Sequence, residues 1–434
     1  MKLLIYPSRL HSGKVRINGY KHSMVQIVAL AVALNQKTLI KNIPLVDDTF
    51  VLQQILRQTG CVFDIKDRSI YLDPTGIYNH KIDENLSSKI HGSLYLFSAF
   101  AARLGKVCFS ESGGCRIGEE VLQGKRPFKH VSDVLKEFGY NGNKHGNEYV
   151  FTQCKPKQLF NVMNYSDNPK YLSGSSVSSA TKVGILLSAK NGYGRILNPY
   201  YKNDVMDMLR YLRDCGFQVF ADKKHIEINS ANKKVNFVEF MLSDCVSEVI
   251  TYITLALMNN LKLHLKITNP KQLKKALAPE ILLLKKINAK IEYNAHSVDI
   301  CPVKKINSVN IKVLHTTIQS DHHPFFALLL TRALRPSYIR EYVWRDRFKY
   351  VQELNKLGFK IIRIGNKIDI FPSNPVAKET FLNGCDTRTV ALLIIASLAT
   401  HSNVEIIDFE HLRRGYGDFL ENLRRLGANI ESTT

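Results

Sequence analysis

The stretch "VLQQILRQTGCVFDIKDRSIYL", residues 51–72, combines two periodicities that together predict a helix followed by a β-hairpin. Leu52, Ile55 and Leu56 recur at three- and four-residue spacing, as on the apolar face of a helix, and Gly60 stands where such a helix would end. After Gly60, apolar and polar residues alternate on both sides of "KDR", which is typical of two strands joined by a tight turn.

The same pattern recurs five more times along the chain, at intervals of 69 to 79 residues. The copies are residues 131–152, 208–229, 281–302, 350–372 and 419–431. Glycine or asparagine punctuates each copy, at Gly60, Gly139, Gly216, Asn288, Gly358 and Gly427. A more apolar helix followed by a strand precedes each copy, and such a helix is expected to lie deep in a core. The predicted repeat is therefore helix–strand–helix–strand–strand, six times over.

Six repeats of this size predict an α/β protein of two domains with three repeats each. The polar stretch "NSANKKVN", residues 229–236, lies near the middle of the chain and is the expected crossover. We therefore expect a first domain over residues 18–231 and a second domain that contains residues 232–434.

The bulk composition of the 434 residues favours a soluble, cytoplasmic, globular protein. Hydrophobic residues make up 45%, the N-terminal apolar run is too brief for a secretory signal, and no run is long enough to insert into a membrane. The eight cysteines are scattered without a CxxC pair or zinc-ligand spacing, so they predict free thiols in a reducing compartment.

The net charge of +22 favours anionic partners, which could be nucleic acid, an anionic membrane surface or small phosphorylated substrates. The basic residues are interleaved with apolar ones along the whole chain, without a basic tail or a dense Lys/Arg run. No motif therefore supports specific nucleic-acid binding, and phosphorylated small molecules are the preferred partners.

Chemically distinctive side chains gather just before the apolar helices and just after the strands that follow them. Those before the helices are Lys21, His22, His91, Ser173, Ser175, Ser176, Asp321, Asp386 and Arg388, and those after the strands are Cys115, Arg126, Arg347 and Arg414. Helix starts and strand ends lie at the same pole of such a repeat, so these residues are expected to converge. Helix N-termini bind phosphate readily, and the serines suit a phosphate cradle.

Each of these signals also has a purely structural interpretation. The serines and Asp321 could simply cap helices, using the same side chains. Cys115, in the glycine-rich basic stretch "SGGCRIGEEVLQGKRP" (residues 112–127), could be an ordinary loop cysteine, although neighbouring cations favour a reactive thiolate.

Four motifs resemble the enolpyruvyl transferases over nearly the whole chain. They are "GGCRIG" (113–118), "RDRF" (345–348), "DTR" (386–388) and "RRGY" (413–416) with "LENLRRLGANI" (420–430). The chain is most similar to the UDP-N-acetylglucosamine carboxyvinyltransferases of peptidoglycan synthesis, a cell-wall pathway. The resemblance implies two inverse α/β domains joined by a double crossover, with residues 1–17 belonging to the second domain.

The resemblance also implies a reaction and roles for individual residues. The enolpyruvyl group of phosphoenolpyruvate would move to an acceptor hydroxyl with release of phosphate, and neither a metal nor an organic cofactor would be required. Lys21, Arg126, Arg388 and Arg414 match the cations that hold phosphoenolpyruvate. Asp321 matches the residue that takes the acceptor's proton, with Arg347 and Asp386 beside the reacting centre. Cys115 matches the loop cysteine that protonates the methylene carbon or forms a transient adduct.

The chain departs from the family pattern where the acceptor would bind. His22 stands in place of an asparagine, His91 in place of an arginine, about six extra residues follow "GGCRIG", and "SGSSVSSAT" (173–181) replaces a less serine-rich phosphate segment. The acceptor is therefore expected to be UDP-N-acetylglucosamine or, as the alternative, a nucleoside monophosphate or another phosphorylated compound of secondary metabolism. A catalytically idle relative, or a nucleic-acid-binding protein using the fold and its charge, is the alternative of another class. The sequence leaves the oligomeric state open, a monomer included.

Overall fold

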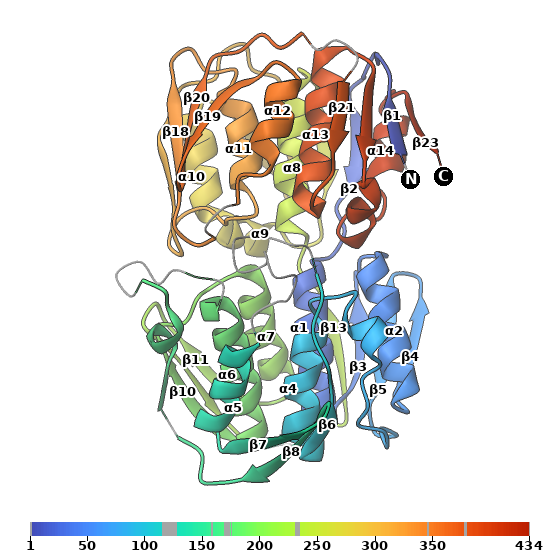
Figure 1. Ribbon diagram of the computed structural model, residues 1–434, viewed down its shortest axis with the longest axis vertical. Helices are drawn as coiled ribbons and strands as arrows, with labels where there is room; N and C mark the ends of the chain where they lie inside the picture. The colour runs from blue at the N-terminus through green and yellow to red at the C-terminus, as the bar shows by residue number, and fades with distance from the viewer. Residues whose placement is uncertain are drawn as a thin grey trace. The chain divides into compact units, whose positions relative to one another are not determined.

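The computed structural model describes residues 2–114, 128–157, 159–168, 174, 176–230, 235–344, 347–376 and 380–433 (Figure 1). These residues form two compact units. The first unit holds the described residues from Gly19 to Ser243, and the second unit holds those up to Asn18 together with those from Asp244 onward. The chain thus passes into the first unit after Asn18 and returns to the second unit after Ser243.

The first unit consists of alternating helices and short strands. Its elements are α1 (Lys21–Leu34), β3 (Lys37–Lys41), α2 (Asp47–Gln58), β4 (Val62–Lys66), β5 (Ser69–Asp73), α3 (Glu84–Ser87), α4 (Ser93–Leu104), β6 (Lys106–Cys108), α5 (Lys129–Glu137), β7 (Tyr140–His145), β8 (Glu148–Gln153), β9 (Leu159–Asn161), the 3₁₀ helix η2 (Val162–Tyr165), α6 (Ser176–Asn191), β10 (Tyr193–Leu197), α7 (Asn203–Asp214), β11 (Gln218–Ala221), β12 (His225–Asn229) and β13 (Phe237–Met241).

The second unit has the same alternation and includes both ends of the chain. Its elements are β1 (Lys2–Ile5), β2 (Gly13–Arg16), α8 (Val246–Met258), β14 (Leu263–Lys266), α9 (Pro270–Ala276), α10 (Ala278–Lys286), β15 (Lys290–Tyr293), β16 (Ser297–Cys301), β17 (Ile311–Val313), α11 (His323–Leu330), β18 (Ser337–Glu341), α12 (Tyr350–Lys356), β19 (Lys360–Ile364), β20 (Lys367–Phe371), β21 (Thr380–Asn383), α13 (Thr387–Thr400), β22 (Val404–Ile407), the 3₁₀ helix η4 (Phe409–Arg414), α14 (Phe419–Arg425) and β23 (Ile430–Thr433).

The described strands form six small sheets, one for each predicted repeat. In the sheet β17-β18-β20-β19, for example, β18 pairs antiparallel with β20, as the predicted repeat requires. In each sheet, a further short segment pairs in parallel with the first strand of the predicted repeat. Examples are β17 beside β18 and β9 beside β10. Beside β6 this segment is reduced to a single bridge, which joins Lys81 to Cys108. The sequence missed this short parallel strand, because three to five residues carry too little periodicity.

The six punctuating residues have the left-handed backbone that the repeat predicts. Their φ angles are 93° at Gly60, 87° at Gly139, 91° at Gly216, 69° at Asn288, 89° at Gly358 and 92° at Gly427. This conformation ends each amphipathic helix at little steric cost for glycine or asparagine. The "KDR" turn is likewise confirmed as a hairpin, since Asp67 and Arg68 both have positive φ between β4 and β5.

The apolar helices form the core of each unit, as predicted. Residues 23–33 of α1 are all buried, and so are nearly all residues of α13. In the first unit α1, α4 and α6 contact one another, and in the second unit α8, α11 and α13 do the same. Figure 1 shows these helices side by side within each unit, with strands outside them. Burial on all sides explains why these helices lack a polar face.

The division between the units differs from the expected one at the second crossing. The sequence placed residues 232–434 in the second domain, but β13 pairs in parallel with β3 of the first unit. The first unit therefore extends to Ser243, because its sheet needs β13 as an edge strand. The expected crossover at residues 229–236 lies partly outside the described residues.

Over the described residues, no helix is both long enough and apolar enough to span a bilayer.

Candidate functional site

Three buried helices of the second unit bring their N-terminal ends together. Ser247 at the start of α8 lies with its Oγ 3.1 Å from Nε2 of His322, the residue just before α11. Arg388, the second residue of α13, contacts Asp321, which also precedes α11. The predicted convergence of helix starts is therefore present in this unit, and it gives the site a positive electrostatic bias.

Asp321 lies between two arginines. Nη1 of Arg347 donates to Oδ1 of Asp321 at 2.7 Å, while Nε and Nη2 of Arg388 lie 3.4 and 3.3 Å from Oδ2. The Asp321 side chain keeps 20% of its surface exposed, against 7% for Arg347 and 9% for Arg388. A carboxylate that stays accessible beside two guanidinium groups is placed to accept a proton from a substrate whose anionic groups those guanidiniums bind.

The alternative that Asp321 caps a helix is not supported by the backbone. The N-cap residue of α11 is His322, not Asp321, and the His322 side chain makes no cap hydrogen bond. Asp386 is the residue that caps: its Oδ1 accepts from the N–H groups of Arg388 and Thr389, at 2.9 and 3.2 Å. Asp386 therefore fixes the start of α13, which carries Arg388, as an N-cap aspartate does.

Electrostatics at the cluster favour the charged arginines. Burial alone would lower the pKa of Arg347, but the carboxylates of Asp321 and Asp386 outweigh burial and raise that pKa. The guanidinium carbon of Arg388 lies 5.1 Å from the ring centre of the buried Tyr416, a cation–π arrangement. Both arginines are thus permanently charged groups beside Asp321, Arg388 at the start of α13 and Arg347 in the segment that follows β18. Arg414 is half-buried and ends η4 in the same unit.

Two buried carboxylates behind this cluster were not predicted from the sequence. Glu341, at the end of β18, accepts from Oγ of Ser320 at 2.7 Å, and burial raises its pKa to about 7. Glu248, in the first turn of α8, accepts from the backbone and side chain of Asn18, and burial likewise raises its pKa to about 7. A glutamate inside an otherwise apolar run was the available signal for Glu248.

In the first unit, three of the predicted residues at helix starts, Lys21, His22 and His91, contact neighbouring side chains. Lys21 begins α1, and its Nζ lies 2.9 Å from Oδ2 of Asp48 at the start of α2. The His22 ring packs edge-on against Tyr20 with centroids 5.2 Å apart. The His91 ring packs edge-on against Tyr95, in the first turn of α4, at 6.0 Å.

Around α6, which begins at Ser176, the structure reveals polar side chains that sequence reasoning missed. Nζ of the buried Lys182 lies 2.6 Å from Oδ2 of Asp204, and it lies 5.5 Å from the centre of the Tyr95 ring. Burial alone would lower the pKa of Lys182, but Asp204 raises it. Nε2 of His130 lies 2.7 Å from Oγ of Ser179, and burial lowers the pKa of His130 to about 4, so it is neutral at pH 7. Lys182 lies within an apolar helix, which was the signal for its special environment.

Four predicted site residues lie outside the described residues: Cys115, Arg126, Ser173 and Ser175. The structure does describe the two glycines that precede Cys115. The N–H of Gly113 donates to the carbonyls of Ser87 and Ile90, and a Cβ there would lie 1.6 Å from the Ser88 carbonyl oxygen. Only glycine fits so close an approach, which explains the first glycine of "GGCRIG".

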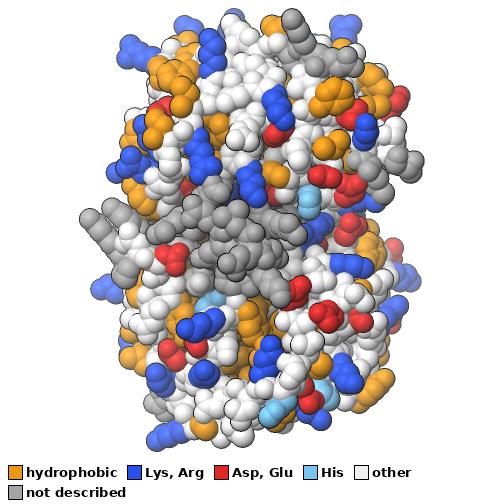
Figure 2. Space-filling view, viewed as in Figure 1, with side chains coloured by type: hydrophobic (Ala, Val, Ile, Leu, Met, Phe, Trp, Pro, Cys, Tyr) orange, Lys and Arg blue, Asp and Glu red, His pale blue; other side chains and the backbone are white. Residues whose placement is uncertain are grey.

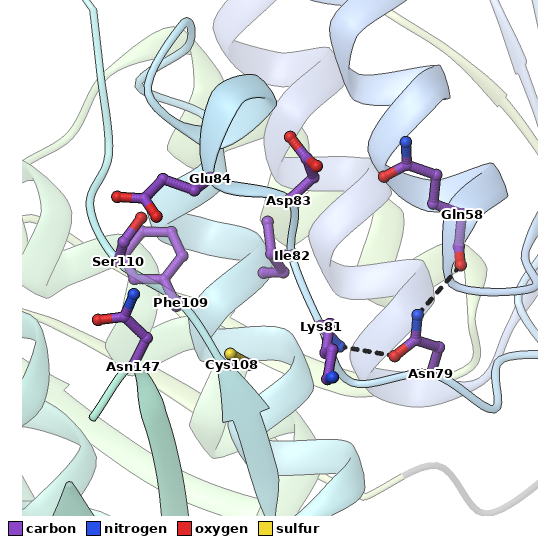
Figure 3. A pocket seen from close by; sticks show the side chains of 10 residues that line it. All are labelled: Gln58, Asn79, Lys81, Ile82, Asp83, Glu84, Cys108, Phe109, Ser110 and Asn147. Atoms are coloured by element: carbon purple, nitrogen blue, oxygen red, sulfur yellow. Dashed lines mark hydrogen bonds between the residues drawn. The ribbon is translucent and has the colours of Figure 1, made fainter. Parts of the chain in front are cut away.

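A pocket of about 460 Å³ opens in the first unit beside the parallel bridge of Lys81 with Cys108. Its lining residues are Gln58, Asn79, Lys81, Ile82, Asp83, Glu84, Cys108, Phe109, Ser110 and Asn147. In Figure 3, Lys81, Ile82 and Cys108 lie between Gln58 and Asn79 on one side and Glu84, Ser110 and Asn147 on the other. None of the predicted site residues that the structure describes lines this pocket.

The basic side chains are dispersed over the visible surface (Figure 2), as they are along the sequence. On the face shown in Figure 2, lysine and arginine side chains are scattered among acidic and apolar ones over both units.

Among the residues that the structure describes, no group of three or more His, Cys, Asp and Glu side chains is arranged to hold a metal ion. The arginine-flanked carboxylate is therefore the chemically most distinctive described site, and it suits binding of a small anion next to a proton acceptor.

Comparisons with known proteins identify relatives along the whole chain. A family model described as EPSP synthase (3-phosphoshikimate 1-carboxyvinyltransferase) matches residues 5–423. UDP-N-acetylglucosamine 1-carboxyvinyltransferase 2 of Prochlorococcus marinus is 25% identical over 437 residues, covering 99% of this chain and 97% of the relative. The UDP-N-acetylglucosamine 1-carboxyvinyltransferase of Halothermothrix orenii is 26% identical over 433 residues, covering 99% of each.

Solved structures give the same picture at the level of the fold. The enolpyruvyl transferase NikO from Streptomyces tendae superimposes with a TM-score of 0.91 at 30% identity, covering 100% of this chain and 99% of that one. EPSP synthase from Acinetobacter baumannii superimposes with a TM-score of 0.73 at 14% identity and full coverage of both chains. The predicted α/β fold of six repeats is confirmed by these structures.

Proposed function

Because the chain belongs to the EPSP synthase (3-phosphoshikimate 1-carboxyvinyltransferase) family and is an enolpyruvyl transferase, we propose that Asp321, Arg347 and Arg388 form part of its catalytic centre. The observation that carries this proposal is the Asp321 carboxylate, just before α11, held between Arg388 at the start of α13 and Arg347 in the segment after β18. We also infer that the two compact units are the two domains of the family fold, with the boundaries at Asn18 and Ser243.

The chemistry assigns a role to each group. The oxygen of the acceptor hydroxyl bonds to C2 of phosphoenolpyruvate while Asp321 accepts the proton of that hydroxyl. An acid, proposed to be Cys115, protonates C3 at the same stage. The C2–O bond to phosphate then breaks, and C3 loses a proton, which restores the double bond. The products are the enolpyruvyl ether and inorganic phosphate, so the atoms of both substrates are accounted for. The arginines stabilise the negative charge of the phosphate and carboxylate throughout.

Asp321 can serve as the base because the two arginines that it contacts can also bind the anionic substrate. In the described state its oxygens face Arg347 and Arg388, and the same guanidinium groups are the natural partners for a bound anion. An anionic substrate would therefore compete with Asp321 for the arginines and would leave the carboxylate more basic. Lys21 and Arg414 are proposed to add further positive charge, and Arg126 is proposed to do so from outside the described residues.

The acceptor is proposed to carry a compact phosphate, with a nucleoside monophosphate as the specific candidate and UDP-N-acetylglucosamine as the alternative. His22 and His91 support this, because a partly charged histidine holds a diphosphate less firmly than a permanent cation does. The serine-rich start of α6, where Ser176 is the first helical residue, supports it as well, because hydroxyl groups and free N–H groups at a helix start are suited to donate to a terminal phosphate.

A phosphate-release assay should distinguish the acceptors. With phosphoenolpyruvate as donor, we expect release to depend on the acceptor and to be faster with a nucleoside monophosphate than with UDP-N-acetylglucosamine. A panel of UDP-sugars and nucleoside monophosphates at equal concentration provides the comparison. Ordinary turnover with UDP-N-acetylglucosamine and none with the monophosphates would instead identify a cell-wall enzyme.

The same acceptor should bind less tightly when the start of α6 loses a hydroxyl. Ser176→Ala is expected to weaken its binding by about 1–3 kcal/mol, through the loss of a hydrogen bond to a charged phosphate. Isothermal titration calorimetry measures the change. Ser69→Ala, at a half-buried serine on β5 of the same unit, is the matched control. Equal affinities of Ser176→Ala and the unmodified protein would contradict the proposed cradle.

Cys115 should react faster than the other seven cysteines. Four of those, Cys61, Cys215, Cys245 and Cys385, are held as thiols because burial raises the pKa of each to about 12. The epoxide fosfomycin should therefore label Cys115 first, and phosphoenolpyruvate should alter the rate of labelling. Mass spectrometry of peptides measures both, and equal labelling of Cys115 and the exposed Cys154 would count against a thiolate at Cys115.

A further inference from the structure

Glu341 is fully buried and joins the segments that carry Asp321 and Arg347. One of its oxygens accepts from the N–H groups of Val343 and Trp344, at 2.6 and 3.1 Å, where the chain leaves β18 toward Arg347. Its other oxygen accepts from Oγ of Ser320 at 2.7 Å, next to Asp321. The carboxylate thus links the end of a strand, the loop after it and the loop before α11.

The same carboxylate also reaches Arg347 through Ser320. Nη1 of Arg347 lies 3.4 Å from Oγ of Ser320 and 2.7 Å from Oδ1 of Asp321. The negative charge of Glu341 attracts Arg347, which opposes the burial of that guanidinium. Asp321 and Glu341 therefore hold Arg347 from two directions, and only Asp321 has an accessible side chain.

We propose that Glu341 is a positioning residue for the transfer reaction: it orients Arg347 and the Ser320–Asp321 segment so that the arginine faces the reacting centre. Glu341 does not touch the substrate in this proposal and acts through Arg347. The inference rests on the proposed function of Asp321 and Arg347. Its functional consequence is that the orientation depends on an ionised Glu341.

Ionisation of Glu341 is expected to occur near neutral pH. Burial raises its pKa to about 7, so the carboxylate is protonated below that pH and charged above it. The other groups that face it are Arg347, His323 of α11, whose Nε2 lies 3.4 Å away, and Tyr350 of α12. Burial lowers the pKa of His323 well below its usual value and raises that of Tyr350 well above, so both stay neutral near pH 7. Turnover should therefore rise through about pH 7.

Glu341→Gln tests the proposal, because the amide oxygen can still accept from Val343 and Trp344 while the charge is lost. We expect kcat to fall about 10-fold or more, since a small misplacement of a catalytic group is costly. The limb of the pH profile near 7 should disappear. Glu353→Gln is the control, because Glu353 is a buried carboxylate of α12 that bonds Lys356 and the N–H of Asn383 instead.

A double-mutant cycle separates positioning from mere stability. In an Arg347→Lys background, where the forked guanidinium is already lost, Glu341→Gln should change kcat by less than about twofold. If the losses of kcat from Glu341→Gln and Arg347→Lys were additive, the proposal would be overturned. It would also be overturned if the limb of the pH profile near 7 were unchanged in Glu341→Gln and disappeared only in Glu248→Gln. If Glu341→Gln does not fold, Ser320→Ala should lower kcat in the same direction without affecting the melting temperature greatly. Full turnover in Ser320→Ala would then overturn it.

The outcome is distinguishable from a failure of the proposed function. Loss of turnover in Asp321→Asn together with full turnover in Glu341→Gln overturns only the positioning role. Full turnover in Asp321→Asn overturns the proposed catalytic centre itself.

Discussion

Asp321→Asn should lower kcat about 100-fold or more without weakening the binding of phosphoenolpyruvate. Asparagine preserves the shape of the side chain but cannot accept the hydroxyl proton at neutral pH, and a placed base contributes roughly this much. The arginines that hold Asp321 remain in place to bind the anionic substrate, which is why binding should survive. Steady-state phosphate release and calorimetric titration with phosphoenolpyruvate measure the two quantities separately.

Asp369→Asn is the matched control for this substitution. Asp369 lies on β20 of the same unit, 27% exposed and paired with Lys367, away from the helix starts. Its replacement should leave kcat unchanged. Asp386→Ala gives a second comparison, because Asp386 caps α13 and the loss of its side chain should lower stability by about 1 kcal/mol. If Asp321→Asn lost stability with no specific loss of kcat, Asp321 would be structural.

Lys182→Met should reduce the free energy of unfolding by about 3–5 kcal/mol, the largest stability effect that we expect in the first unit. Lys182 and Asp204 form a buried ion pair at 2.6 Å, with side-chain exposures of 7% and 1%. Methionine fills a similar volume but leaves the Asp204 carboxylate buried without its cation, and such a charge is costly. Urea denaturation followed by circular dichroism measures the change.

Restoring neutrality should recover part of the lost stability. The double substitution Lys182→Met with Asp204→Asn removes both charges and should be more stable than Lys182→Met alone. The control Lys41→Met breaks an ion pair with Glu239 at the protein surface and should have a much smaller effect, because water screens exposed charges. If Lys182→Met were no more destabilising than Lys41→Met, the buried pair would not be a major source of stability.

The arginine-flanked carboxylate shows how far a linear motif reaches. Residue types at helix starts and strand ends were enough to select Asp321, Arg347 and Arg388. They were not enough to separate a base from a helix cap, because an aspartate before a helix suits both roles. That distinction needed the backbone at His322 and the side-chain distances, which assign capping to Asp386 and arginine contacts to Asp321.

The partners in the first unit were missed for a related reason. Lys182 and Asp204 lie 22 positions apart, and no local pattern links a lysine in one helix to an aspartate at the start of the next. Glu341 likewise meets Ser320 across 21 positions. Such contacts depend on how helices and strands pack, so a single sequence gives only the weak signal of a charge within an apolar run.

By itself, the sequence determined the six α/β repeats, their left-handed helix ends and the helices that form each core. Those features depend on interactions within about 25 residues, where the spacing of apolar residues and the freedom of glycine act directly. The tertiary structure alone decided the edge strands, the boundary after Ser243 and the partners of each buried charge. β13 belongs with β3 although nearly 200 residues separate them, because the backbone N–H and C=O groups of β3 on that side find their partners in a strand from a distant part of the chain.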